Sequence, residues 1–255
     1  MIGREDVKEN DLFFTCSLLE YIARKTKNKP SLIVNALGKN TIEKIYELAD
    51  VYHSDNIEKV SDDFIEEHRI TTGDFDSVAR AKYLIPTHFD IGKIYKRLIL
   101  GLEKEKKISR IDALFFAYNS PLTDKINDYN SAFYYDSPQN ILRAFLGKDM
   151  LERAVTVTID RPLGSKHPTH DFVYPINYGY VKGIFAGDGE EQDAYVIDVD
   201  KPVTEFFGQI VAIIKRKNDV EEKWVVSPIN TRYTEDEIKQ AVLFQEQYFD
   251  FEILM

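Results

Sequence analysis

Cysteine is almost absent from this chain of 255 residues, which contains one such residue, Cys16. A disulfide within the chain needs two cysteines, and a zinc cluster built on cysteine ligands needs more than one. Both are therefore excluded. Because Cys16 falls on an apolar helical pattern, we expect it to be a buried core residue rather than a nucleophile.

Long apolar runs and an excess of positive charge are also missing. The sequence has no window of about eighteen uninterrupted apolar residues, and its start lacks the basic-then-apolar order of a secretory signal. We therefore expect a cytoplasmic protein with no membrane partner. The formal net charge is -10 and the sequence pI is about 5.1. Because proteins that bind nucleic acid carry clustered Lys and Arg, no nucleic-acid partner is expected.

The composition that remains is that of a globular protein, with 44% hydrophobic and 30% charged residues. The length allows one large domain or two small ones. Residues 151–255 carry a net charge of -8, against -2 for residues 1–150. Because the spacing of apolar residues changes at the same place, we predict two domains, 1–150 and 151–255.

The N-terminal part shows helical periodicity. Breaks at 28–30 and 38–40 separate three early helices, and a further helix is expected from Asp90 to Leu102. We predict an all-helical domain, whose role is open between regulation, homo-oligomer formation and partner docking through its helices. The apolar residues at helical spacing are Leu12, Cys16, Leu19, Ala23, Ile42, Ile45, Tyr46 and Ala49.

The C-terminal part shows the shorter period of β-strands. Several short strands within about 75 residues suggest a small barrel. Trp224 follows Lys223 on one strand, so their side chains should face opposite sides of the sheet. A final helix is expected from Thr234 to Tyr248, because T-E-D-E supplies a hydroxyl cap and acids in the first turn. The expected strands are Ala154–Ile159, Ala194–Val199, Gln209–Ile214 and Lys223–Val226.

An acidic turn is the densest polar segment of the chain. Residues 188–193 read D-G-E-E-Q-D and lead directly into an expected strand. Four carboxylates in six residues repel one another, so the segment suits either a solvated turn or the surroundings of a bound cation. Composition alone leaves both interpretations open.

A tyrosine-rich segment, V-Y-P-I-N-Y-G-Y at 173–180, precedes the acidic turn, and charged residues follow it at 215–224. Buried tyrosines need hydrogen-bond partners for their hydroxyl groups. Carboxylates of this kind suit a metal ion, whereas lysines and tyrosine hydroxyls suit an oxyanion.

The order of these segments resembles soluble family I inorganic pyrophosphatase. The likeness covers about residues 154–250 and includes K-N-D-V-E-E-K-W at 217–224 and F-Q-E-Q-Y at 244–248. It implies a small OB-like five-stranded β-barrel with flanking helices, so that with the all-helical domain before it the expected fold class is α+β. It also implies magnesium as the cofactor, with two or more ions per site, and pyrophosphate as the substrate, hydrolysed to two phosphates.

The resemblance also implies site residues, position by position. Asp188 and Asp193 match metal-binding aspartates with a catalytic role, and Glu190 stands where the family has the aspartate that assists the attacking water. Asp219 and Glu221 fall near two further metal ligands. The implied substrate-binding residues are Lys166, Tyr174, Tyr178, Lys223 and Tyr248.

Four departures from the family concern the same site. Thr156 and Thr158 stand where the family usually has a lysine and a glutamate, and Phe249 follows Tyr248 where the family has a lysine. Glu190 is one methylene longer than the aspartate of the family, and an error of about 1 Å can cost about a hundredfold in rate. The implied site is therefore slow, altered in substrate or inactive, unless other groups compensate.

Other polar and aromatic residues have simpler explanations. His167 and His170 could meet phosphate or metal, but a surface loop explains them equally well. Asp50 and His53 are three residues apart on an expected helix, where capping or an ion pair suffices. The aromatic run at 133–135 suits either a binding surface or a buried packing strip between domains.

The sequence is therefore compatible with three functions. The first is magnesium-dependent hydrolysis of inorganic pyrophosphate by the C-terminal domain. The second is a catalytically weakened pyrophosphatase-like module that binds a phosphorylated metabolite or partner. The third keeps hydrolysis but changes the substrate to another phosphoanhydride, a nucleotide or a phosphate ester.

Overall fold

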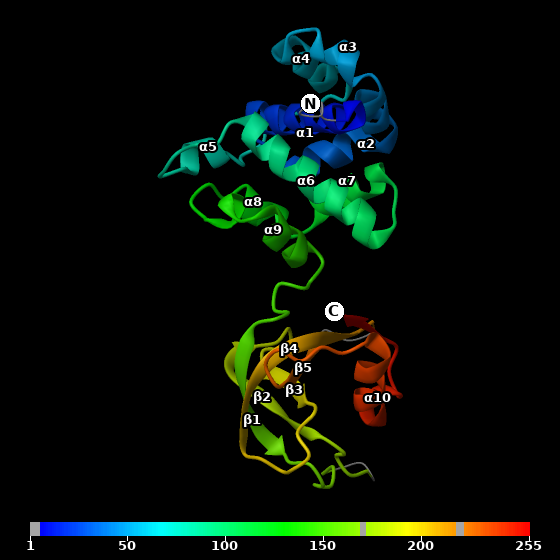
Figure 1. The fold of residues 1–255 in the computed structure, drawn as a ribbon. Coiled ribbons are helices and arrows are strands. Elements are labelled where there is room, and N and C mark those ends of the chain that lie inside the picture. The colour runs from blue at the N-terminus through cyan, green and yellow to red at the C-terminus, as the bar shows by residue number, and fades with distance from the viewer. Residues whose placement is uncertain (1–5, 169–171, 218–221) are drawn as a thin grey trace. The chain divides into compact units, whose positions relative to one another are not determined.

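The computed structural model describes residues 6–168, 172–217 and 222–255. His170, Asp219 and Glu221 lie outside the described residues. The chain divides into two compact units, Met1–Leu146 and Gly147–Met255 (Figure 1). Each unit has hydrophobic clusters of its own. In the part of the chain that is described, no helix is long and apolar enough to cross a membrane.

The N-terminal unit is helical, and its first helix is central to it. Helix α1 packs against α2, α3, α4 and α6, so it is surrounded by other helices on several sides. The elements are α1 (Val7–Thr26), α2 (Pro30–Glu47), α3 (Ala49–His53), α4 (Ile57–Glu67), α5 (Ser77–Arg80), α6 (His88–Lys106), α7 (Arg110–Asn119), α8 (Thr123–Ile126), the 3-10 helix η1 (Phe133–Tyr135) and α9 (Pro138–Phe145).

Local sequence explains where these helices begin and bend. The expected break at 28–30 separates α1 from α2, whereas the expected break at 38–40 is a kink inside α2, where Gly38 has φ 72°. Glycine tolerates this left-handed conformation. Helix α6 begins two residues before the expected start: Thr87 caps it, and Asp90 completes the capping box from the first turn.

The structure also decides between interpretations of isolated residues in this unit. Cys16 is fully buried, as expected. Tyr134, in the aromatic run, is part of the unit's own core, while Tyr135 is exposed. Asp50 accepts a hydrogen bond from the backbone N–H of Val51, and the ring of His53 packs edge-on against Phe14 at 5.7 Å. These contacts are structural.

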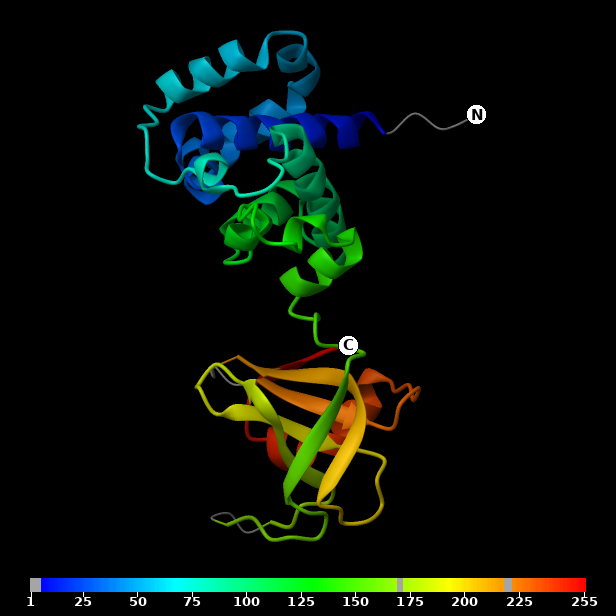
Figure 2. The same cartoon turned by 90° about the vertical axis from the view of Figure 1, so that its left-hand side faces the viewer.

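The C-terminal unit is a closed barrel with one added strand, which confirms the expected α+β class and OB-like five-stranded barrel. The strands follow the order β1-β2-β3-β5-β4, β1 pairs with β4 to close the barrel, and β6 extends the sheet beside β4 (Figure 2). The elements are β1 (Ala154–Arg161), β2 (Asn177–Phe185), β3 (Glu191–Val196), β4 (Glu205–Arg216), β5 (Glu222–Ser227), α10 (Glu235–Glu246) and β6 (Phe251–Leu254).

Two strands were not expected from the sequence, and several bounds differ. Strand β2 is formed by the end of the tyrosine-rich segment, and β6 follows α10. Within β2, a Cβ at Gly179 would lie 1.9 Å from the carbonyl oxygen of Thr158, so close pairing of β1 and β2 requires glycine. Helix α10 has the expected cap at Thr234 but ends at Glu246 rather than Tyr248.

The barrel wall has two different faces. One hydrophobic cluster, which includes Val157 and Trp224, fills one side of the wall. A second cluster covers the other side, where Ile238 and Val242 of α10 pack against the strands. Lys223 bonds to residues of this second side, so Lys223 and Trp224 face opposite sides as expected. We call the side covered by α10 the outer face, and the candidate site lies on it.

Candidate functional site

Three of the residues implied by the resemblance meet on the outer face. Asp193 Oδ2 accepts hydrogen bonds from Tyr178 Oη and from Lys223 Nζ, each at 2.5 Å, and Lys223 Nζ also lies 2.8 Å from Tyr178 Oη. Lys223 is 4% exposed and Tyr178 is 8% exposed, whereas the side chain of Asp193 is 34% exposed. We call Tyr178, Asp193 and Lys223 the outer-face triad.

Strand pairing brings the triad together. Strands β3 and β5 are parallel, with Ala194 opposite Trp224, which places Asp193 and Lys223 side by side. Strand β2 pairs with β3 through Tyr180 and Asp193, and Tyr178 is on the same face two residues away. A buried ammonium is costly unless a carboxylate compensates it, and Asp193 does so here.

The surroundings of Tyr178 determine the protonation state of its hydroxyl group. Burial, and then the charge of Asp193, raise the pKa of Tyr178 far above its ordinary value of 10. The Tyr178 hydroxyl therefore stays protonated and donates to the carboxylate. Both described bonds to Asp193 reach Oδ2, so the partly exposed carboxylate stays oriented while it faces the surface of the barrel.

The loop before β2 adds aromatic residues beside the triad. The ring of Tyr174 is 2% exposed and lies 5.6 Å from that of Tyr178. His167 packs on this wall, with its ring 4.7 Å from Phe172 and 5.8 Å from Tyr174. Lys166 is exposed and pairs with Val173 through the backbone. Of the implied loop residues, Tyr174 is thus beside the triad, while Lys166 is at the surface.

A β-bulge in β1 brings two residues to this face that the sequence analysis missed. Ile159 is opposite Gly179 and Arg161 is opposite Tyr178, so Asp160 is the additional residue of the bulge. Arg161 Nη1 donates to Asp160 Oδ2 at 2.9 Å, and its guanidinium also reaches the Tyr174 hydroxyl. The signal in the sequence was the acid-base pair D-R at the end of an alternating strand.

The electrostatics connect this pair to the triad. Burial is the main cause that raises the pKa of Asp160, and the charge of Asp193 adds to it. Thr158 is opposite Tyr180, which is in turn opposite Asp193. The resemblance leads one to expect a glutamate in place of Thr158. Asp160, two residues further along β1, therefore supplies a carboxylate close to the position where that glutamate is missing.

The acidic turn is more loosely connected. Asp188 and Glu190 are exposed, and Asp188 Oδ1 accepts from the Glu190 backbone N–H at 3.0 Å. Within the described ranges, no three His, Cys, Asp or Glu side chains are grouped so that they could hold a metal ion. Carboxylates are the donors that magnesium prefers, so the chemical type fits, but the described residues supply only part of a ligand set.

The last implied residue, Tyr248, is 72% exposed, and its neighbour Phe249 has a structural contact. The guanidinium of Arg216 lies 3.5 Å from the centre of the Phe249 ring. Arg216 also forms a buried ion pair with Glu246 at 2.8 Å, and Tyr195 Oη donates to the same carboxylate at 2.5 Å. Phe249 thus covers a buried ion pair that anchors the end of α10.

Comparisons with known proteins give a partial likeness. No family model and no curated protein sequence matches the chain. Solved structures that resemble part of it include inorganic pyrophosphatases from Neisseria gonorrhoeae (19% identity, TM-score 0.31, 37% of this chain and 73% of that one), Ehrlichia chaffeensis (17%, 0.33, 40% and 85%) and Helicobacter pylori (15%, 0.31, 40% and 82%).

Proposed function

We propose that the C-terminal unit hydrolyses inorganic pyrophosphate to two phosphates in a magnesium-dependent reaction. The observation that carries the proposal is the outer-face triad, in which a buried lysine and a tyrosine orient one partly exposed aspartate. The order of motifs in the sequence supports it, because the same three residues belong to the segments that resemble pyrophosphatase. The Asp160–Arg161 pair adds a carboxylate and a second cation beside them.

Each group has a role that suits a polyanionic substrate. Lys223 and Arg161 would bind phosphate oxygens, the Tyr174 hydroxyl would orient them, and Tyr178, whose hydroxyl donates to Asp193, would line the substrate site. Lys166 and Tyr248, both at the surface, would reach the substrate from outside. Glu190 would accept a proton from the attacking water.

Asp188, Asp193, Asp219 and Glu221 would hold the magnesium ions. Pyrophosphate would be repelled by these carboxylates alone, so the site requires divalent cations for binding. When bound, magnesium supplies charge neutralisation of the phosphate oxygens and acidifies a water molecule.

The test is phosphate release from pyrophosphate by the purified full chain, with and without magnesium. Asp193→Asn should lower the magnesium-dependent rate about a hundredfold or more, because the triad loses its carboxylate charge. Asp250→Asn is the matched control, since Asp250 forms an exposed ion pair with Lys217. The control should keep the wild-type rate.

Two other outcomes would redirect the assignment. Equal rates in Asp193→Asn and wild type would rule out this site as the source of activity. No phosphate release from folded wild-type protein, combined with thermal stabilisation by pyrophosphate, would favour the binding module instead. Thr156 and Thr158 favour that alternative, because they replace a phosphate contact and a metal ligand of the family.

A further inference from the structure

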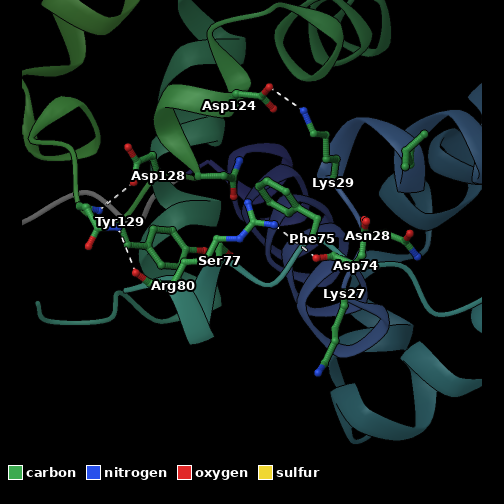
Figure 3. A pocket seen from close by; sticks show the side chains of 13 residues that line it. Lys27, Asn28, Lys29, Asp74, Phe75, Ser77, Arg80, Asp124, Asp128 and Tyr129 are labelled. Atoms are coloured by element: carbon green, nitrogen blue, oxygen red, sulfur yellow. Dashed lines mark hydrogen bonds and ion pairs between the residues drawn. The ribbon is translucent and has the colours of Figure 1, made fainter. Parts of the chain in front are cut away.

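The N-terminal unit contains a pocket that the proposed hydrolysis does not use. Its volume is about 490 Å³, and it lies where the α1–α2 junction meets the segments at 74–80 and 124–130 (Figure 3). Backbone bonds fix two of these parts together: Gly73 N–H donates to the Thr26 carbonyl and Phe75 N–H to the Lys27 carbonyl, each at 2.8 Å. The pocket is therefore built by packed elements.

The walls of the pocket carry charges of both signs. Lys27 and Lys29 come from the α1–α2 junction, whereas Asp124 and Asp128 come from α8 and the residues after it (Figure 3). Lys29 Nζ and Asp124 Oδ2 are 2.6 Å apart and join these walls. With Arg80 and Asp74, also in the lining, basic and acidic side chains are equal in number. A ligand of strong net charge would therefore be repelled by half of them.

The aromatic residues of the pocket already have cations against their rings. Lys29 Nζ lies 5.6 Å and Arg80 Cζ lies 5.1 Å from the centre of the Phe75 ring. Arg24 Cζ lies 5.0 Å from the centre of the Tyr129 ring, and its Nη2 donates to the Tyr129 hydroxyl at 2.6 Å. Because cations already lie against these rings, less ring surface is open to a stacked nucleobase.

Arg80 and Asp128 are held at one edge of the pocket by a shared neighbour. Asn130 Nδ2 donates to the Arg80 carbonyl at 3.1 Å, and the Asn130 backbone N–H donates to Asp128 Oδ1 at 3.1 Å. Asn130 Oδ1 also accepts from the Lys82 N–H at 2.8 Å. These bonds fix the backbone of Arg80 and the carboxylate of Asp128, while the Arg80 guanidinium donates through Nη2 to the Asp74 carbonyl at 3.3 Å (Figure 3). A guanidinium and a carboxylate thus lie on neighbouring segments, where they can bind opposite charges of one ligand.

A second, smaller hollow of about 10 Å³ adjoins this pocket and has a carboxylate in its wall. Glu20 is fully buried, and neither of its carboxylate oxygens has a hydrogen-bond partner among the described residues. Such a hollow accepts one group the size of water, and a buried carboxyl group without a partner needs one for hydrogen bonding. The two hollows share Asn28, Phe75, Ser77 and Asn127 in their linings.

We propose that the larger pocket binds a small zwitterion of the α-amino-acid type, with its carboxylate at Arg80 and its ammonium group at Asp128. Balanced charge favours a ligand that carries both signs, and the covered rings leave room for polar or aliphatic side chains rather than bases. Glu20 and its hollow provide a polar floor for a donor group or its water. This site is independent of the proposed hydrolysis.

Calorimetric titration of the full chain with individual protein amino acids tests the proposal without any hydrolysis. For the amino acid that binds, the amine without the carboxylate and the acid without the amine should each bind at least tenfold more weakly. Arg80→Gln and Asp128→Asn should each weaken binding at least tenfold. Asp63→Asn, an exposed carboxylate of α4 outside the pocket lining, is the matched control and should bind as wild type does.

Three results would overturn the proposal. The first is that no amino acid binds at millimolar concentration to protein whose circular dichroism shows it to be folded. The second is equal binding of the analogues with a single charged group. The third is binding of inorganic phosphate or a nucleotide with the same dependence on Arg80, which would make the pocket an anion site.

Discussion

Glu20 places a carboxyl group in a fully buried position of α1. Burial raises its pKa to about 8, and the charge of Arg24 offsets only part of this effect. The spacing of Leu12, Cys16 and Leu19 predicted one buried face of this helix. Because α1 is surrounded by α2, α3, α4 and α6, polar side chains outside that face, including Glu20, are buried as well.

Glu20→Gln should become more stable relative to wild type as pH rises from 5 to 8. In the unfolded chain a glutamate releases its proton near pH 4.5, while folded Glu20 keeps it up to about pH 8. Raising the pH in this window therefore favours the unfolded wild-type chain, by about 1.4 kcal/mol per pH unit for one proton. The glutamine does not titrate, so the variant lacks this loss.

Urea unfolding followed by circular dichroism at 222 nm, at several pH values, measures this difference. Glu67→Gln, an exposed change in α4, controls for replacing a surface carboxylate with an amide. A stability difference between Glu20→Gln and wild type that stays the same at every pH would contradict the assignment of a protonated Glu20.

At the candidate site, the residues that could be predicted were those in linear motifs. Tyr178, Asp193 and Lys223 each belong to a short segment with a recognisable order, and strand pairing brings them together. Asp160 and Arg161 were missed because a bulge decides which face they occupy. A bulge depends on how β1 pairs with β2, and alternation along one strand does not encode that pairing.

At the level of elements, the alternating pattern predicted strands that bury one hydrophobic face, as in β1, whereas β4 has buried residues on both faces of its second half. Strand β2 was not predicted, because its tyrosines and glycines were interpreted as candidate site residues rather than as part of a strand. Strand β6 is four residues long, and pairing with β4 supports it. Both strands depend on partners distant in sequence, which local propensity does not supply.

The first turn of α10 should be sensitive to its cap. The Thr234 side chain accepts from the Glu237 backbone N–H, and Glu237 Oε2 accepts from the Thr234 N–H at 2.7 Å. Thr234→Ala removes the first bond and should lower the stability of the barrel unit by about 1 kcal/mol. Thr234→Ser keeps the hydroxyl and should retain most of it. Denaturation followed by Trp224 emission measures both, and an equal loss in both variants would contradict the capping role.

The whole molecule contains two units with separate clusters of buried side chains. One cluster is formed within the helices before Leu146, and the other two are formed within the barrel and α10. The single tryptophan, Trp224, is buried in the barrel, whereas most helical residues are in the N-terminal unit. Tryptophan emission and helical circular dichroism therefore report mainly on different units.

Truncation of a buried side chain in one unit should lower the unfolding midpoint of the signal that reports on that unit and leave the midpoint of the other signal unchanged. Leu19→Ala in α1 and Ile213→Ala in β4 each remove a fully buried side chain, and each should destabilise its own unit by about 2–5 kcal/mol. Leu19→Ala should lower the midpoint seen by circular dichroism at 222 nm but leave that of Trp224 emission in place. Ile213→Ala should do the reverse. If both substitutions move both midpoints together, the two units unfold as one cooperative body, because only coupled cores respond jointly to a change in either.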